Sequence, residues 1–294
     1  LKSRIRSVKS TKQITKAMQM VAASKMRRAQ DATKASTPYF QAASDVLTFL
    51  AGQGATDEHP LFQRREVKTR LIIFISADKG LAGAYNSNVS KKYLELLKRD
   101  EERGIKNLTI TVGRKASALV ARLKNVEVIG SYDDVPDHPS GVAFYTTLNM
   151  ITGMFENGEV DVVMVVYTNF VNSVIQEATW MRVLPAGTEV MSNPAKVPNS
   201  VKDAAFEPSI AEVLDAVAYR LVGARLFQAH LDSQASEHVM RMVAMKNATD
   251  NAGDLIEDLT LEMNKARQAA ITQINESLRA EVAFLYESWA HYFF

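Results

Sequence analysis

The sequence contains no cysteine, which excludes disulfide bonds, thiolate metal sites and cysteine nucleophiles. The same absence fits a reducing compartment. No run of eighteen apolar residues occurs, so the sequence predicts no membrane-spanning helix. The five histidines are scattered and match no metal-binding spacing such as HExxH. Without cysteine and without a metal-binding histidine motif, the sequence offers few residues for metal or thiol chemistry.

Charge is unevenly distributed along the sequence. Residues 1–34 contain ten lysines and arginines against the single acid Asp31, a net charge of +9, so the rest must carry −7 to give +2 overall. A basic segment of this kind predicts an acidic partner, which could be nucleic acid, anionic lipid or a carboxylate-rich protein surface.

The residues from Ser209 to the C-terminus have the pattern of one long helix. Steps of three and four residues from Leu214 to Phe284 visit twenty-one positions, of which sixteen are apolar. No proline follows Pro208. A repeat of 3.5 residues is typical of a left-handed coiled coil. The repeat is rich in alanine, and apolar residues also lie outside it, so we expect other chains to enclose this helix.

Residues 2 to about 55 also have helical spacing, with Pro38 as the one breaker. Proline removes a backbone donor, so we expect a kink or a restart near Thr37. Two long helices at opposite ends of a chain, each with a thin apolar face, are natural partners. The sequence therefore predicts that they pair antiparallel.

The middle of the chain alternates short apolar runs with helical stretches. The runs are 70–76, 106–112, 126–129, 160–167 and 176–184, and the helical stretches are 87–103, 115–123 and 141–157. This alternation predicts a mostly parallel sheet, with the last run as an antiparallel edge. The predicted fold class is therefore α/β plus long helices: a Rossmann-like domain with a five-stranded, mostly parallel sheet, inserted in an antiparallel coiled coil.

The first strand-to-helix turn, residues 76–86, is where a sheet of this kind would bind a nucleotide. It contains neither GxGxxG nor GxxxxGK[ST], and Gly80 and Gly83 alone are a weak signal. Asp78 and Lys79 could be catalytic, but such residues are common in turns. No paired carboxylates or Ser–His–Asp set stands out elsewhere. We therefore expect no catalytic residue, cofactor or metal on this chain.

Three segments together resemble the gamma subunit of F-type ATP synthase. They are RIRSVKSTKQITKAMQMVAASKMRRAQ at 4–30, SADKGLAGAYNSN at 76–88, and SEHVMRMVAMKNATDNAGDLI at 236–256, which continues as LTLEMNKARQAAIT at 259–272. The last segment is the most specific, and together the three span nearly the whole chain. Ala82 and Ala84 stand where that family often has Cys and Gly, and the tail at 277–294 is more aromatic than is usual there.

The resemblance implies a non-catalytic rotor shaft, present in one copy per complex. The shaft lies within a hexamer of alpha and beta subunits, and its α/β foot contacts the epsilon subunit and the membrane c-subunit ring. Proton flow turns the c ring and drives ATP synthesis, and hydrolysis reverses the rotation. The implied location is the cytoplasmic face of the bacterial plasma membrane or, alternatively, the matrix face of the mitochondrial inner membrane.

The resemblance also implies contacts with the acidic lever loop of the catalytic subunits. The matching residues are Met18, Arg241, Gln268 and Thr272. The basic charge of Lys16, Lys25 and Arg28 complements that loop. For each residue the alternative is an ordinary solvated position or, for Met18, packing in the helix seam.

Two other functional classes remain open from the residues alone. One is a coiled-coil scaffold or nucleic-acid-binding protein that uses the basic first helix, and the other is an α/β enzyme with helical arms. No aromatic residue precedes Tyr39, which disfavours nucleic-acid recognition.

The predicted segments are a first helix at 1–60, an α/β domain at 68–190, a linker at 191–208 and a second long helix at 209–294.

Overall fold

The computed structural model describes residues 1–135, 141–187 and 197–293. The chain forms two compact units. The first, here called the helical unit, combines Leu1–Met20 with Ala244–Phe294. The second, here called the sheet unit, is Val21–Val243. Part of the predicted linker, residues 188–196, lies outside the described residues.

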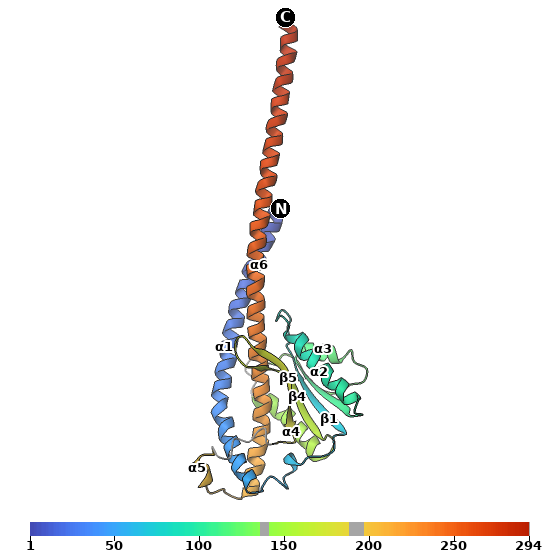
Figure 1. Cartoon of the computed structure of the whole chain (residues 1–294), viewed down its shortest axis with the longest axis vertical. Coiled ribbons are helices and arrows are strands. Elements are labelled where there is room, and N and C mark those ends of the chain that lie inside the picture. The colour runs from blue at the N-terminus through green and yellow to red at the C-terminus, as the bar shows by residue number, and fades with distance from the viewer. Residues whose placement is uncertain (136–140, 188–196, 294) are drawn as a thin grey trace. The chain divides into compact units, whose positions relative to one another are not determined.

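Two long helices contribute to both units (Figure 1). They are α1, Lys2–Gly52, and α6, Ile210–Phe293. The prediction of a long helix at each end of the chain is confirmed. Of the two outcomes expected near Thr37, a restart does not occur, because α1 continues through Pro38; a kink stays a prediction. Proline lacks the backbone N–H that would bond one turn back, and the Thr37 hydroxyl donates to the carbonyl of Thr33 at 2.9 Å beside it.

The sheet unit contains one five-stranded sheet with the order β3-β2-β1-β4-β5. The strands are β1 Thr69–Ile75, β2 Lys106–Val112, β3 Glu127–Tyr132, β4 Val162–Phe170 and β5 Gln176–Leu184. The first four pair in parallel, and β5 pairs antiparallel with β4. The predicted mostly parallel sheet with an antiparallel edge is therefore confirmed.

Helices cover both faces of this sheet, which explains why its central strands are almost uniformly apolar. On one face, α2 (Tyr85–Glu101) and α3 (Arg114–Val120) pack against Ile72, Phe74 and Val166. On the other face lie α4, Gly141–Glu156, and the first part of α6. Figure 1 shows α2 and α3 on the side of the sheet away from α6. Two short helices, η1 (Pro60–Phe62) and α5 (Asn199–Lys202), complete the described elements.

The position of α6 against the sheet is the feature that the sequence analysis missed. Its buried residues Ala218, Val222, Leu226 and Ala229 belong to the same core as the sheet. Gly223 lies so close to α4 that an added Cβ would stand 2.8 Å from the Leu148 side chain. The repeat positions Leu214 and Leu221 pack against α1, as a seam for a partner helix should. The apolar residues outside the repeat face the sheet, so this part of α6 is also a third layer of the α/β domain.

The two long helices also pack against each other, antiparallel, within each unit. In the sheet unit, Leu47 and Leu50 of α1 are buried with Leu214 and Leu221 of α6. In the helical unit, the buried Thr249 hydroxyl donates to the Thr15 hydroxyl at 2.8 Å. Early residues of α1 thus meet late residues of α6, as predicted. None of the described helices has the length and apolar character needed to cross a bilayer.

Candidate functional site

The site lies at the carboxyl ends of β1 and β4, which are neighbours in the sheet. The chain leaves β1 through α2 on one face and reaches β4 through α4 on the other face. This reversal makes the carboxyl ends of β1 and β4 a topological switch point, where open α/β sheets commonly bind ligands. Here, residues of α6 bond directly to the backbone at this edge.

Two serines of α6 hold the end of β4. The backbone N–H of Thr168 donates to the Ser233 hydroxyl at 3.1 Å, and the Ser236 hydroxyl donates to the Thr168 carbonyl at 3.4 Å. All three residues are buried. A buried backbone group without a hydrogen-bond partner costs free energy. These two hydroxyls supply the hydrogen bonds that a further strand or a bound water would otherwise make to Thr168. The contact fixes α6 to one residue of the sheet.

One turn further along α6, Arg241 holds the turn that follows β1. Its Nη2 donates to the carbonyls of Lys79 and Gly80 at 3.4 and 3.3 Å, and its Nη1 lies 2.6 Å from a carboxylate oxygen of Glu237. The Arg241 and Glu237 side chains are only 12% and 15% exposed. Partial burial makes such a charge-assisted contact stronger than one at the surface.

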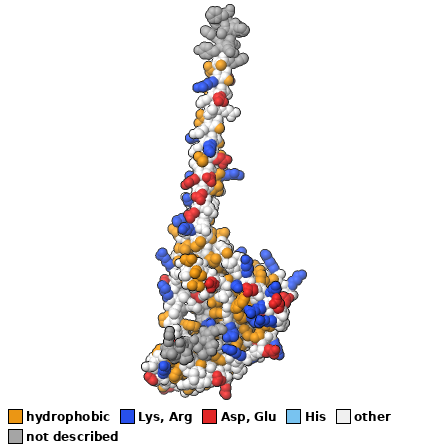
Figure 2. Space-filling view, viewed as in Figure 1, with side chains coloured by type: hydrophobic (Ala, Val, Ile, Leu, Met, Phe, Trp, Pro, Cys, Tyr) orange, Lys and Arg blue, Asp and Glu red, His pale blue; other side chains and the backbone are white. Residues whose placement is uncertain are grey.

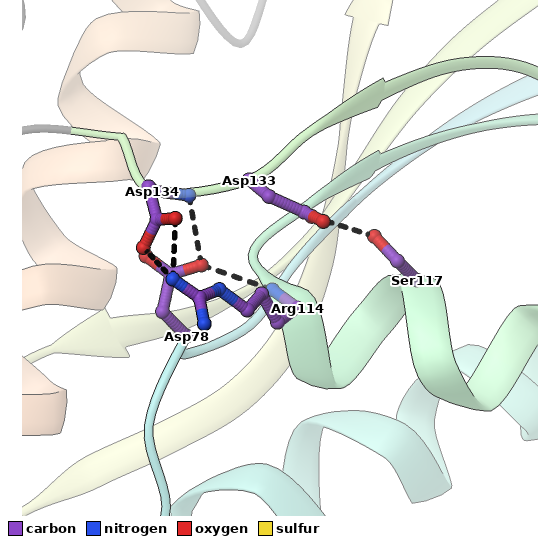
Figure 3. A network of polar contacts seen from close by, with 5 residues as sticks. All are labelled: Asp78, Arg114, Ser117, Asp133 and Asp134. Carbon is purple, nitrogen blue, oxygen red and sulfur yellow. Dashed lines mark hydrogen bonds and ion pairs between the residues drawn. The ribbon is translucent and has the colours of Figure 1, made fainter.

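The same turn is joined to two more strand ends through Asp78 (Figure 3). One Asp78 carboxylate oxygen accepts the backbone N–H of Arg114 at 3.0 Å and that of Asp134 at 3.1 Å. Arg114 also forms an ion pair with Asp134, and the Ser117 hydroxyl donates to Asp133 at 2.9 Å. Asp78 therefore links the loops after β1, β2 and β3.

Gly113, which follows β2, permits a very close approach of two loops. It has φ +93°, and a Cβ there would lie 2.3 Å from the Ser76 carbonyl oxygen. The Ser76 hydroxyl in turn accepts the N–H of Ala116 at 2.6 Å. A side chain at position 113 would separate these loops, so glycine is required on both conformational and steric grounds.

A cavity of about 280 Å³ lies beside these contacts. Both signs of charge line it: three cations, of which Lys79 and Arg241 are two, and three carboxylates, those of Asp78, Asp134 and Glu237. This mixture does not favour a phosphate, which is usually held by converging backbone N–H groups and cations. Within the described ranges, no group of three or more His, Asp or Glu residues could hold a metal ion.

Buried titratable groups surround the same edge. Burial, together with the Glu237 carboxylate, raises the pKa of Tyr85 well above its usual range. Burial lowers the pKa of His230 to about 4, which Asp78 partly opposes, and raises that of Asp232 to about 6, which its hydrogen bond from Gln228 partly opposes. Tyr85 and His230 are therefore neutral at pH 7. At the carboxyl ends of β1 and β4, hydrogen bonds stabilise the structure more than charges on these side chains do.

Three of the predicted contact residues lie in the sheet unit. Arg241 is engaged by its own chain, as described above. Lys25 is half-buried and lines the same cavity as Arg241, whereas Arg28 is exposed. The structure thus brings Lys25 and Arg241 to one cavity and leaves Arg28 at the surface.

The other four lie in the helical unit. Lys16 is exposed and lines a groove of about 590 Å³ whose floor includes Met20 and Ile256. Met18 is half-buried. Gln268 and Thr272 are both exposed, one turn apart, and the Thr272 hydroxyl donates to the Gln268 carbonyl at 3.0 Å. Their side chains are open to a partner.

Apolar side chains remain exposed along α6 in the helical unit. They recur at helical spacing: Leu261, Ile271, Ile274, Leu278, Val282 and Leu285, each between 51% and 64% exposed. Figure 2 shows apolar, basic and acidic side chains interspersed there. Of the described side chains, none after Ala252 is buried. A row of this kind marks a surface for other proteins.

Sequence reasoning missed Ser233, Ser236, Arg114 and Asp134. Asp78 was considered only as a possible catalytic residue. A signal was present in α6, because the stretch 228–238 carries polar residues on several faces of an otherwise alanine-rich helix. Such a cluster is costly unless each member has a partner, and the partners lie far away in sequence.

Together these features define a class of protein: an α/β domain whose switch point is closed by a long helix that continues beyond it. A family model described as ATP synthase matches residues 1–274. The ATP synthase gamma chain of Stenotrophomonas maltophilia (strain R551-3) is 41% identical over 275 residues, which cover 93% of this chain and 94% of that one. The chain belongs to the ATP synthase gamma chain family.

Solved structures agree with this assignment. The central stalk and c-ring structure of Tetrahymena thermophila mitochondrial ATP synthase aligns at a TM-score of 0.53 and 25% identity, over 80% of this chain and 99% of that one. The OSCP, F1 and c-ring structure of the Euglena gracilis mitochondrial enzyme aligns at 0.63 and 15% identity, over 96% and 93% of the two chains. At that identity the second match supports the fold alone.

Proposed function

We propose that this chain is the shaft through which torque passes in a rotary ATP synthase. As a gamma chain, it is the non-catalytic central-stalk subunit of that complex, and the chemistry takes place on other subunits. Proton flow through the c ring turns the shaft for ATP synthesis, and hydrolysis turns it in reverse. The observation that carries the proposal is α6 itself, which closes the switch point of the sheet and then continues as an exposed helix.

The partners are the alpha and beta subunits, the epsilon subunit and the membrane c ring. The exposed apolar row on α6 supports enclosure by the alpha–beta hexamer, because exposed apolar surface of this kind marks a site where other proteins bind. The family match does not support the nucleic-acid alternative, and the positive charge of α1 instead complements an acidic protein surface.

For the individual contacts, we propose that Lys16, Met18, Gln268 and Thr272 meet the acidic lever loops of the catalytic subunits. Exposure of Lys16, Gln268 and Thr272 supports this assignment. Lys25 and Arg28 supply positive charge that complements these loops. The resemblance implies a contact with the same loops for Arg241, although its guanidinium is already bonded within the chain. Attraction of this kind steers and orients partners more than it adds affinity.

We further propose four functional segments: helices at 1–60 and 209–294, a foot at 68–190 that meets the epsilon subunit and the c ring, and a linker at 191–208. The chain needs no cofactor of its own. It belongs to a membrane-associated complex, and we place it at the cytoplasmic face of a bacterial plasma membrane; the relative from Stenotrophomonas maltophilia supports this choice over the mitochondrial matrix.

The experiment is to co-express the chain with the alpha and beta subunits of its own source and to purify the complex. We expect one copy per hexamer and an ATPase rate higher than that of alpha and beta alone. A chain that stays free and leaves the rate unchanged would contradict the proposal. Binding of the free chain to DNA, with affinity that falls steeply with salt, would then restore the alternative.

A further inference from the structure

We propose that Arg241 and Asp78 are positioning residues that lock α6 to the sheet, so that torque passes between foot and shaft without slip. The proposal rests on the rotor function above. It assigns Arg241 a role within this chain, in place of a direct contact with a catalytic subunit as its main function. Arg241 is two residues from Val243, where the sheet unit ends, so it holds the last turn of α6 in that unit.

The lock acts at two heights along the helix. Ser233 and Ser236 bond to Thr168 of β4, and Arg241 bonds to Lys79 and Gly80 after β1. From Ser233 to Arg241 the helix rises about 12 Å. A single contact would leave α6 free to tilt or to turn about its axis, whereas contacts at two heights and on two strands resist both motions.

Asp78 connects the turn bonded by Arg241 to the rest of the sheet. This turn contains Asp78, whose carboxylate accepts hydrogen bonds from N–H groups in the loops after β2 and β3 (Figure 3). The N–H of Ala77, just before it, donates to Asn86 of α2 at 3.1 Å. A twist applied to α6 is thereby carried to three parallel strands and a helix, not to one flexible turn.

The bonding of Arg241 supports an internal role. Both terminal nitrogens of its guanidinium already have partners: Nη1 at the Glu237 carboxylate and Nη2 at the two carbonyls. With 12% of the side chain exposed, little of it is left for another subunit. Releasing it would break contacts that are worth more in this partly buried place than at an open surface.

The test uses the complete ATP synthase in membrane vesicles. The readout is the ratio of ATP-driven proton pumping to ATP hydrolysis for Arg241→Met, Asp78→Ala, both together, and Arg220→Met as an exposed control on the same helix. We expect each single change to lower the ratio by about two- to tenfold, the range for loss of one hydrogen-bonded link. The double variant should be no worse than the poorer single one, because both act in one path.

Conservative variants separate positioning from folding. Asp78→Asn keeps the oxygen that accepts both N–H groups, so we expect it to retain the ratio that Asp78→Ala loses. Arg241→Lys keeps a cation that can donate to one carbonyl, so it should be intermediate. If Asp78→Ala prevents assembly, the comparison of Asp78→Asn with Arg241→Lys still decides: a normal ratio in both overturns the proposal.

Three outcomes would contradict one of the two claims, the lock or the rotor function. A normal ratio for Asp78→Ala beside a lowered one for Arg241→Met would place Arg241 at a partner subunit and overturn the lock. A wild-type chain that fails to join the complex would instead contradict the proposed rotor function. Normal coupling in the wild-type complex and in all variants would overturn the lock alone.

Discussion

The two parts of α6 differ in how their side chains are used. Up to Val243, in the sheet unit, the helix buries leucine, valine and alanine against the sheet. Polar side chains such as Ser233 and Arg241 form hydrogen bonds or ion pairs with residues of the same chain. From Ala244 onward, in the helical unit, buried residues become rare, and none of the described ones follows Ala252. One continuous helix therefore contains a segment packed on its own sheet and a segment whose side chains are mostly exposed.

Core truncation should separate these two segments most strongly. Leu226→Ala removes a buried side chain from the core and should cost about 2–5 kcal/mol of unfolding free energy. Leu278→Ala, at 52% exposure, should change it by less than about 0.5 kcal/mol. Urea denaturation of the isolated chain measures both. Equal losses would show that the segments are stabilised alike.

A glycine pair tests the close loop approach in the sheet unit. Gly113→Ala places a Cβ at φ +93° and 2.3 Å from a carbonyl oxygen, so we expect a loss of about 3 kcal/mol. Gly153→Ala, in α4 with no atom within 4 Å of the added Cβ, should stabilise by up to about 1 kcal/mol. Thermal unfolding of both variants decides the matter, and a normal melting temperature for Gly113→Ala would contradict the geometry.

Two buried groups of α6 should give the sheet unit opposing pH dependences. The pKa of His230 is lowered to about 4, so the unfolded chain takes up a proton below about 6.5 and stability falls as pH drops from there to 4. The pKa of Asp232 is raised to about 6, so the folded chain holds the extra proton and stability falls as pH rises from about 4 through 6. Between pH 4 and 6 the two effects largely cancel.

Substitutions should uncover each effect. Asp232→Asn should make stability fall more steeply on acidification below pH 6 and should stabilise the chain at pH 8 by up to about 3 kcal/mol. His230→Gln should leave the opposite slope. Urea unfolding at pH 4.5, 6 and 8, compared with the wild type, measures both differences. Parallel curves for all three proteins would contradict the assigned pKa shifts.

A serine pair gives the smallest expected effect. Ser233→Ala leaves the buried N–H of Thr168 without its partner and should cost about 1–2 kcal/mol. Ser277→Ala removes a hydroxyl that donates to the carbonyl of Ile274 on the exposed helix, and it should cost less than about 0.5 kcal/mol. Chemical denaturation again provides the measurement. Indistinguishable variants would remove the Thr168 contact from the account.

The sequence predicted the elements well because their signals are local. The apolar runs of the strands, the 3.5-residue repeat of α6 and the antiparallel edge strand could each be recognised within a short window. At Pro38 the sequence allowed a kink or a restart, and the continuous helix excludes the restart, because the long helical stretches on either side outweigh one local breaker.

The site was less predictable because its contacts are distant in sequence. Arg241 meets Gly80 across 161 positions, and Ser233 meets Thr168 across 65. The apolar repeat of α6 packs on α1 in the sheet unit, whereas apolar residues outside the repeat pack on the sheet, and a sequence does not state what such extra residues face. The resemblance implies a partner contact for Arg241, which stays a prediction, and no sequence pattern indicated its bonds to distant residues of its own chain.

Hydrogen exchange along α6, measured in the isolated chain and in the assembled complex, tests the central claim most directly. We expect amides of α6 before Val243 to be protected in both states, because that segment is packed on its own sheet. Amides after Ala252 should exchange quickly in the isolated chain and become protected in the complex. Equal protection of both segments in the isolated chain, or no gain after Ala252 on assembly, would contradict the division of α6 proposed here.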